Sequence, residues 1–320
     1  MSSKSKTPVA VTSRSFAKHP VLRAELLECY ENVSFNQTGK ILSGEDLVSF
    51  LRGHTKVISG LEIFDSVVLS QLPELKIISK YGVGLDMLDL RAMQKQGILL
   101  GWTPGVNRRS VAELTLVFAL LLVHQAHIAH AELLEGKWKP RSGNLLTGKT
   151  VGIIGCGNVG KDLVQLLKPF GCKILVYDIV EYPEFYALHA IIPMDLETLL
   201  KKSDLVSLHI PLNETTTDFL NDKKLSFLKP SAYLINTSRG KIVDEVALKN
   251  QLKAGKLAGA AFDVFSIEPP EDPELIRLPN FYCTPHIGGS AEEAILAMGR
   301  AAIEGLDHAK NPESYEYCLK

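Results

Sequence analysis

The stretch VGIIGCGNVG, residues 151–160, decides the fold of this chain. Its apolar first half predicts a buried strand, and the glycines at 155, 157 and 160 follow with GxGxxG spacing. Gly155 permits a tight turn, Gly157 lets backbone N–H groups approach a pyrophosphate, and Gly160 lets the next helix pack closely on the strand. The N-terminus of that helix would face the anion. The stretch therefore predicts a strand–turn–helix unit that binds a dinucleotide.

An acidic residue supports this interpretation. Asp178 ends the next predicted strand, CKILVYD, 18 residues after Gly160. A carboxylate there can accept hydrogen bonds from the ribose 2′-hydroxyl and would repel a 2′-phosphate. No arginine follows it directly, so the sequence favours NAD over NADP. The alternatives are a glycine-rich turn without a ligand, or a flavin, whose fingerprint usually lies nearer the N-terminus.

Strands and helices alternate on both sides of this stretch. After Lys149, apolar segments such as DLVSLHIP and SAYLINTS alternate with helical segments such as DEVALKNQLKAG. The first hundred residues repeat the alternation, with VAVTS, KVISG, LKIIS and GILLG as expected strands. Such alternation implies parallel sheets covered by helices, and 320 residues favour two cores over one. We expect an α/β protein with two Rossmann-like or flavodoxin-like, doubly wound parallel-sheet domains and a cleft between them.

Two segments outside these series carry their own expectations. Ser110 and Glu113 have capping-box spacing, so a helix is expected to begin there. This helix is apolar almost all round, which predicts burial in a core or in a subunit interface. The polar tail from Lys310 onward is expected to be loosely held.

The composition limits the classes of partner. The formal net charge is −1, which gives no electrostatic reason to expect nucleic acid or a membrane surface. The longest apolar run, residues 114–123, is about half as long as the ~20 residues that a membrane span needs. No signal peptide is evident. The cysteines are odd in number, scattered and without CxxC spacing, which predicts reduced thiols in a cytoplasmic protein; they are Cys29, Cys156, Cys172, Cys283 and Cys318.

Three further segments of the second half bear side chains suited to catalysis at predicted strand ends. NTSRGKIVDE contains Arg239, AFDVFSIEPP contains Asp263 and Glu268, and CTPHIGGS contains His286. An arginine can bind a carboxylate and polarise a neighbouring carbonyl, and a histidine held by a glutamate can exchange a proton. Taken singly, each has a plainer interpretation as a surface ion pair or a solvated loop residue. Together they are expected to face the same crevice as the glycine-rich turn.

These motifs, in this order, resemble the D-isomer-specific 2-hydroxyacid dehydrogenases, nearest the D-3-phosphoglycerate dehydrogenase branch. The resemblance covers nearly the whole chain and includes KYGVGLDMLDL, TPGVNRRSVAELTL, LTGKTVGIIGCGNVG, INTSRGKIVDEVAL, AGAAFDVFSIEPP and CTPHIGGS. It implies a substrate domain formed by residues 1–103 and 288–320, and an NAD-binding domain formed by residues 104–287. It also implies a homodimer through the helix around residues 110–130, and a short form without a C-terminal regulatory domain.

The resemblance also implies residue roles. Arg239 would anchor the substrate carboxylate and carbonyl, His286 would be the acid/base, and Glu268 would be its partner. Asp263 would meet the nicotinamide amide. The other implied cofactor contacts are Gly155, Gly157, Asn158, Val159, Gly160, Asp178, Ile210, Pro211, Thr237, Ser238, Gly288 and Gly289. The other implied substrate contacts are Lys80 and the backbone N–H groups of Gly82, Val83 and Gly84.

The chain departs from the phosphoglycerate branch where that branch binds phosphate. Lys80 stands at the position of the usual arginine, and a second arginine position near VISGLEIF is apolar or glycine. Arg108 and Arg109 are candidate substitutes, with a solvated helix start as the plainer interpretation. We therefore expect a small D-2-hydroxy or 2-oxo acid as substrate, with 3-phosphoglycerate and 3-phosphohydroxypyruvate as one candidate pair. Glu268 argues against a formate dehydrogenase, which pairs its histidine with glutamine.

Two other functions stay open from the sequence alone. One is a dehydrogenase of phosphite or another small oxyanion, and the other is an NAD(H)-sensing, corepressor-like protein without turnover. A corepressor would be expected to carry disordered tails or a peptide groove, and the chain gives little sign of either.

A histidine run stands apart from these motifs. His124, His127 and His130 have HxxHxxH spacing, but on one helix the full run rotates off any single face. We interpret the run as packed or interfacial histidines and expect no metal.

Overall fold

The computed structural model describes residues 4–315 of the chain. The chain divides into two compact units. The first contains the residues up to Asn107 and those from Glu292 onward, and the second contains Arg108–Ala291. The chain therefore passes between the units at 107/108 and at 291/292, a few residues after the expected boundaries at 103/104 and 287/288.

The first unit is built on a parallel sheet with the order β2-β1-β3-β4-β5, a flavodoxin-like arrangement. Helices α2 and α14 pack against each other, and α14 also contacts β4 and β5. The strands are β1 (Val9–Val11), β2 (Val33–Phe35), β3 (Lys56–Ser59), β4 (Ile77–Lys80) and β5 (Leu99–Gly101). The helices are α1 (Arg14–Lys18), α2 (Pro20–Cys29), α3 (Gly44–Leu51), α4 (Ser66–Ser70), α5 (Leu90–Lys95), α14 (Glu292–Gly305) and the 3₁₀ helix η3 (Pro312–Ser314).

The described part of the tail is held more firmly than the sequence predicted. Lys310 forms an antiparallel bridge with Leu100, and the Tyr315 hydroxyl donates to the Leu100 carbonyl over 2.7 Å. The expectation of a loose tail is therefore wrong for residues 310–315, because backbone pairing at the end of β5 fixes them. Residues 316–320, with Cys318, lie outside the described residues.

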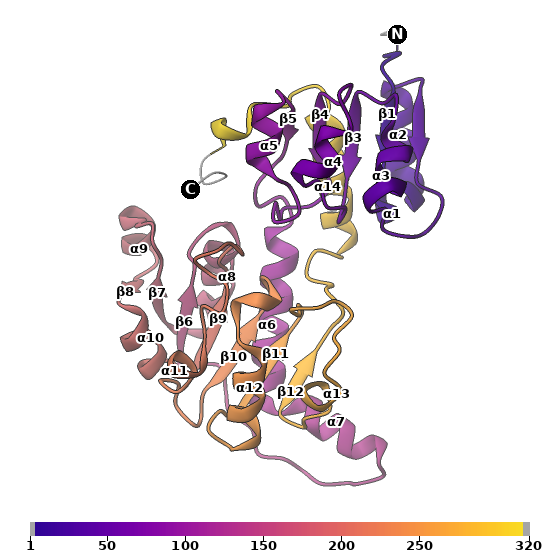
Figure 1. Cartoon of the computed structure of the whole chain (residues 1–320). Helices are drawn as coiled ribbons and strands as arrows, with labels where there is room; N and C mark the ends of the chain where they lie inside the picture. The colour runs from indigo at the N-terminus through magenta and orange to yellow at the C-terminus, as the bar shows by residue number, and fades with distance from the viewer. Residues whose placement is uncertain (1–3, 316–320) are drawn as a thin grey trace. The chain divides into compact units, whose positions relative to one another are not determined.

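The second unit is built on a parallel sheet with the order β12-β11-β10-β9-β6-β7-β8 (Figure 1). The strand order reverses between β6 and β9, which is where ligands bind in open α/β sheets. The strands are β6 (Thr150–Ile154), β7 (Lys173–Tyr177), β8 (Ile192–Pro193), β9 (Leu205–Leu208), β10 (Tyr233–Asn236), β11 (Gly259–Phe262) and β12 (Phe281–Cys283). The helices are α6 (Arg108–His124), α7 (Ala126–Leu134), α8 (Asn158–Leu167), η1 (Lys168–Phe170), α9 (Pro183–Leu188), α10 (Leu196–Lys202), α11 (Asp222–Leu225), η2 (Gly240–Ile242), α12 (Glu245–Lys253) and α13 (Pro273–Ile276).

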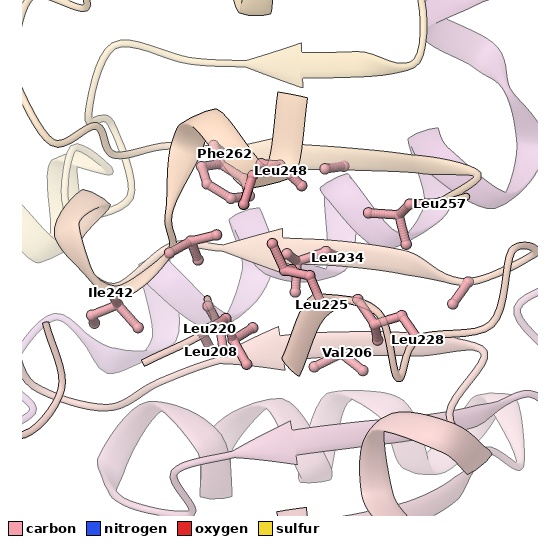
Figure 2. Packing of buried hydrophobic residues seen from close by; sticks show 14 of the residues in the cluster. Val206, Leu208, Leu220, Leu225, Leu228, Leu234, Ile242, Leu248, Leu257 and Phe262 are labelled. Carbon is pink, nitrogen blue, oxygen red and sulfur yellow. The ribbon is translucent and has the colours of Figure 1, made fainter. Parts of the chain in front are cut away.

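Both faces of this sheet are buried, which explains its nearly continuous apolar strands. On one face, Val206, Leu234 and Phe262 pack with leucines of α11 and α12 (Figure 2). On the other face, Ile153 and Ile235 pack with α6 and α8. Each fully buried leucine or isoleucine contributes about 1.5–3 kcal/mol to folding, so the sheet is a rigid base for the loops at its carboxyl edge.

Helix α6 begins earlier than the sequence predicted. It starts at Arg108, so Ser110 lies inside its first turn and the expected capping box is wrong. The left-handed residue Gln125, with φ of 55°, separates α6 from α7. Among the described helices, no single one is long and apolar enough to cross a membrane. The pair α6 and α7 passes that test only together, and it is bent by 69°.

Candidate active site

The residues predicted for the cofactor and for catalysis in the second unit follow the carboxyl ends of six strands of one sheet. They come after β6, β7, β9, β10, β11 and β12. Because parallel strands present their carboxyl ends at one edge, these loops form one row on both sides of the β6/β9 reversal (Figure 1).

The glycine-rich turn after β6 has the shape that a pyrophosphate needs. Gly155 has φ of 92°, and a side chain on it would meet the His209 carbonyl oxygen at 2.6 Å. A side chain on Gly160 would meet the Gly155 carbonyl oxygen. At Gly157, by contrast, an added Cβ would meet no atom within 4 Å. Gly157 caps α8 without any side-chain hydrogen bond, so the first N–H groups of the helix, at Asn158 and Val159, suit an anion.

Asp178 is held against this turn. Its carboxylate accepts from the Cys156 N–H at 2.5 Å and from the Val180 N–H at 2.9 Å. Each carboxylate oxygen has further lone pairs with which to accept from a ribose hydroxyl. Burial raises the pKa of the Cys156 thiol, within the turn, to about 12, which disfavours the thiolate.

The predicted groove residues follow β9 and β10, and one of them, Ile210, borders the same turn. The Ile210 side chain lies 2.9 Å from where a Gly155 Cβ would stand, and the Pro211 carbonyl accepts from Thr216. Thr237 is buried and shares a 2.9 Å hydroxyl hydrogen bond with Thr115 of α6. The Ser238 hydroxyl donates to Asn236 at 2.8 Å. The loop after β10 is thus tied to its own strand and to α6.

Arg239 is placed by a close contact between two loops. A side chain on Gly240 would lie 1.8 Å from the Phe265 carbonyl carbon, so the loops after β10 and β11 touch backbone to backbone. The Arg239 guanidinium donates to the Ser238 carbonyl at 2.8 Å. It also lies near enough to Glu268 to favour the charged carboxylate. The contact at Gly240 therefore brings Arg239 beside the glutamate that was predicted to partner His286.

Glu268 and His286 form a hydrogen-bonded pair. Nδ1 of His286 lies 2.8 Å from Oε2 of Glu268, and the Phe265 N–H donates to Oε1 at 3.1 Å. Partial burial raises the pKa of Glu268, but the His286 hydrogen bond and charge, the Phe265 N–H and the Arg239 charge outweigh it, so the pKa of Glu268 lies below its ordinary value. An ionised Glu268 accepts from Nδ1–H, which leaves Nε2 of the half-exposed imidazole to exchange a proton with a substrate.

Asp263 holds the backbone of the loop that presents His286. Its buried carboxylate accepts from the Thr284 hydroxyl at 2.5 Å, and from the N–H groups of Ile287 and Gly288, both at 2.7 Å. His286 itself has φ of 56°, a left-handed conformation that costs a non-glycine residue about 1 kcal/mol or more. Thr284 was not predicted, and the loop-holding role of Asp263 was missed. Gly289 lies in the turn that the Ser290 N–H closes on the Ile287 carbonyl at 2.8 Å.

The sequence of the second unit matches a known family. Residues 116–288 match the model described as D-isomer specific 2-hydroxyacid dehydrogenase, NAD binding domain. This match covers more than half of the chain.

The chain belongs to the D-isomer-specific 2-hydroxyacid dehydrogenases.

Named relatives of this family match most of the chain. A glyoxylate reductase from Thermococcus litoralis is 41% identical over 253 residues, which cover 76% of each chain. A hydroxypyruvate reductase from Thermotoga maritima is 36% identical, covering 89% of this chain and 91% of the relative. The crystal structure of a putative D-isomer-specific 2-hydroxyacid dehydrogenase from Polaromonas aligns with a TM-score of 0.85 at 27% identity, over 95% of this chain and 96% of that one. Human D-3-phosphoglycerate dehydrogenase is 35% identical over 84% of this chain and 51% of its own. The fold, the NAD-dependent enzyme class and the family predicted from the sequence are therefore confirmed.

The geometry suits the dehydrogenase reaction. NAD supplies the hydride-carrying nicotinamide when it is bound, and the turn at Gly155–Gly160 with Asp178 is the part of this chain that would hold it. Arg239 carries a fixed positive charge that can bind a carboxylate and polarise its neighbouring carbonyl. His286 would deliver a proton from Nε2 to the carbonyl oxygen that becomes the hydroxyl, while Glu268 balances its charge.

The basic residues considered for a substrate phosphate are all engaged within their own units. Arg109 lies 2.6 Å from the carboxylate of the buried Asp162 on α8, and Arg108 lies 4.0 Å from the same side chain. Lys80 is 3% exposed and donates to the Gly60 carbonyl. The loop of Gly82, Val83 and Gly84 follows β4 in the first unit, and its substrate role stays a prediction.

The histidine run is divided by the break after α6. His124 ends α6, whereas His127 and His130 lie on α7. His127 packs on the ring of Tyr282, and burial lowers its pKa. Within residues 4–315, no group of three or more acidic, histidine or cysteine side chains could hold a metal ion.

Proposed function

We propose that this enzyme interconverts a small, unphosphorylated D-2-hydroxy acid and its 2-oxo acid, in the class of glyoxylate and hydroxypyruvate. The commitment of Lys80, Arg108 and Arg109 to internal contacts supports this proposal most directly. A phosphate needs cations that are free to meet it, whereas Lys80 is buried on the Gly60 carbonyl and Arg109 is paired with the buried Asp162 carboxylate at 2.6 Å. The names of the glyoxylate and hydroxypyruvate reductases point to the same class.

In this proposal Arg239 binds the substrate carboxylate and carbonyl, and His286 with Glu268 moves the proton. Asp263 sets the loop, and the N–H groups of Gly82, Val83 and Gly84 meet the carboxylate as the family resemblance implies. The pairing of His286 with Glu268 at 2.8 Å supports the acid/base role.

The test is NADH oxidation at 340 nm with glyoxylate, hydroxypyruvate, pyruvate and 3-phosphohydroxypyruvate. We expect kcat/KM to be at least about tenfold higher for an unphosphorylated acid than for the phosphorylated one, since the phosphate would lack a charge-assisted partner. His286→Ala should lower kcat by about 10²–10⁴-fold, because it removes the proton carrier, while NADH binding persists. His308→Ala, an exposed histidine of the first unit, is the matched control.

The other outcomes are informative. A preference for 3-phosphohydroxypyruvate would contradict the proposal and restore the phosphoglycerate assignment. Turnover of phosphite alone would favour the oxyanion dehydrogenase. Tight NADH binding without turnover of any acid would favour the corepressor-like sensor.

We also propose NAD as the preferred dinucleotide, a homodimer in solution and a reducing, cytoplasmic location. The carboxylate of Asp178 beside the glycine-rich turn supports the preference for NAD. Exposed apolar side chains on and after α7 support the homodimer. A reducing, cytoplasmic location is supported by the free cysteines Cys29, Cys156, Cys172 and Cys283.

A further inference from the structure

The hydroxyl of Ser110 joins two segments that are far apart in the sequence. Ser110 lies in the first turn of α6, three residues after the chain enters the second unit at 107/108. Its Oγ donates to the Gly288 carbonyl at 2.6 Å and accepts from the Ala291 N–H at 3.4 Å. Ala291 is the last residue before the chain leaves the unit. The Ser110 hydroxyl therefore joins the segment by which the chain enters the second unit to the segment by which it leaves.

The same segment carries His286. We define the His286 loop as residues 284–291. Asp263 fixes its first half through Thr284, Ile287 and Gly288, and Ser110 fixes its second half through Gly288 and Ala291. Gly288 is held from both sides, because its N–H donates to Asp263 and its carbonyl accepts from Ser110. A side chain on Gly288 would come within 2.9 Å of Asp263, so this double contact also requires glycine.

The loop needs such support because His286 is in a left-handed conformation. A non-glycine residue keeps φ of 56° only when its surroundings over-determine it. The Asp263 contacts hold the N-terminal side of Gly288 alone. Without Ser110, the Gly288 carbonyl and the Ala291 N–H would lose their protein partner at the point where the loop meets α14.

We propose that Ser110 is a positioning residue. Its hydroxyl holds the His286 loop against the start of α6 and so keeps Nε2 of His286 aligned for proton transfer. This inference rests on the proposed role of His286. The spacing of Ser110 and Glu113 suggests a helix cap, but the Ser110 hydroxyl bonds to Gly288 and Ala291 instead.

The test compares Ser110→Ala with Ser110→Thr, which keeps the hydroxyl. Ser226→Ala is the matched control, because the Ser226 hydroxyl also donates to a backbone carbonyl, at 2.7 Å, in an exposed turn after α11. We expect Ser110→Ala to lower kcat about five- to tenfold, the size of one lost hydrogen bond, with the Kd for NADH within about twofold of wild type. Ser110→Thr and Ser226→Ala should keep kcat within about twofold.

Amide hydrogen exchange provides a readout that does not need turnover. Exchange in residues 284–291 should become at least about tenfold faster in Ser110→Ala and stay unchanged in Ser226→Ala. Three results for Ser110→Ala would overturn the proposal. These are unchanged exchange in the His286 loop, an unchanged kcat, or a loss of NADH binding as large as the loss of kcat. If wild-type enzyme failed to reduce any 2-oxo acid, the proposed function would fail, and the exchange experiment would still decide the role of Ser110.

Discussion

At the scale of single residues, most of the chemistry depends on side chains that hold other side chains. His286 is oriented by Glu268, its backbone is held by Asp263, and its loop is tied to Ser110. The ionised state of Glu268 follows from its neighbours, since its pKa is lowered despite partial burial. Its charge is therefore present at neutral pH and is lost only when the pH falls through that lowered pKa, so the pair with His286 persists across the physiological range.

Asp178 gives a prediction at this scale. Asp178→Ala removes the carboxylate that accepts from Cys156 and Val180 and that would repel a 2′-phosphate. We expect the Kd for NADH to rise about tenfold, because one charge-assisted hydrogen bond to the ribose is lost, and the NADH/NADPH preference to narrow by a similar factor. Fluorescence titration with both dinucleotides measures this. An unchanged preference would show that another group discriminates, and Asp218→Ala, a residue at the far end of the loop after β9, serves as a charge-matched control.

At the scale of elements, the site depends on where loops touch. The sequence predicted which loops bear the candidate residues, because strand patterning and the GxGxxG spacing are local signals. It did not predict the contact at Gly240 or the bond from Ser110 to Gly288, because both join residues far apart in the chain. The short edge strand β2 was also missed, in this case because its local pattern is weak. Val33–Phe35 is only half-buried, so it lacks the apolar run that marked its neighbours.

Gly240 and Gly157 give a paired prediction. Gly240→Ala would place a methyl group 1.8 Å from the Phe265 carbonyl carbon, and the loops after β10 and β11 must separate. We expect a loss of stability of about 1–3 kcal/mol, seen as a lower midpoint in thermal unfolding, together with a fall in kcat as Arg239 leaves Glu268.

Gly157→Ala is the contrast, because its Cβ would enter open space. It should unfold like wild type yet bind NADH at least about tenfold more weakly, since the methyl group stands where the pyrophosphate approaches. Equal unfolding midpoints for Gly240→Ala and wild type would contradict the backbone contact inferred here.

At the scale of the whole molecule, the apolar helix after residue 110 was expected in a core or an interface, and the structure divides it into a buried helix, α6, and a more exposed helix, α7. In α6, Phe118, Ala119 and Leu122 are buried in the core of the second unit. In α7, no residue is fully buried, His127 is only partly covered, and Leu134 is 77% exposed. Sequence alone did not locate the break at Gln125, because neither a glycine nor a proline marks it.

The exposed part gives the last prediction. Leu134 and Trp138, 77% and 86% exposed, are large apolar side chains that a second copy would cover. We expect wild-type protein to be a dimer by light scattering at micromolar concentration, and Leu134→Glu combined with Trp138→Glu to be a monomer, because burying two carboxylates costs several kcal/mol. Val67→Glu, at a 65% exposed site of the first unit, should stay dimeric. The glycine-rich turn and Asp178 lie within one chain, so the monomeric variant should still bind NADH. A monomeric wild type, or a double variant that remains dimeric, would mean that this surface does not join the subunits.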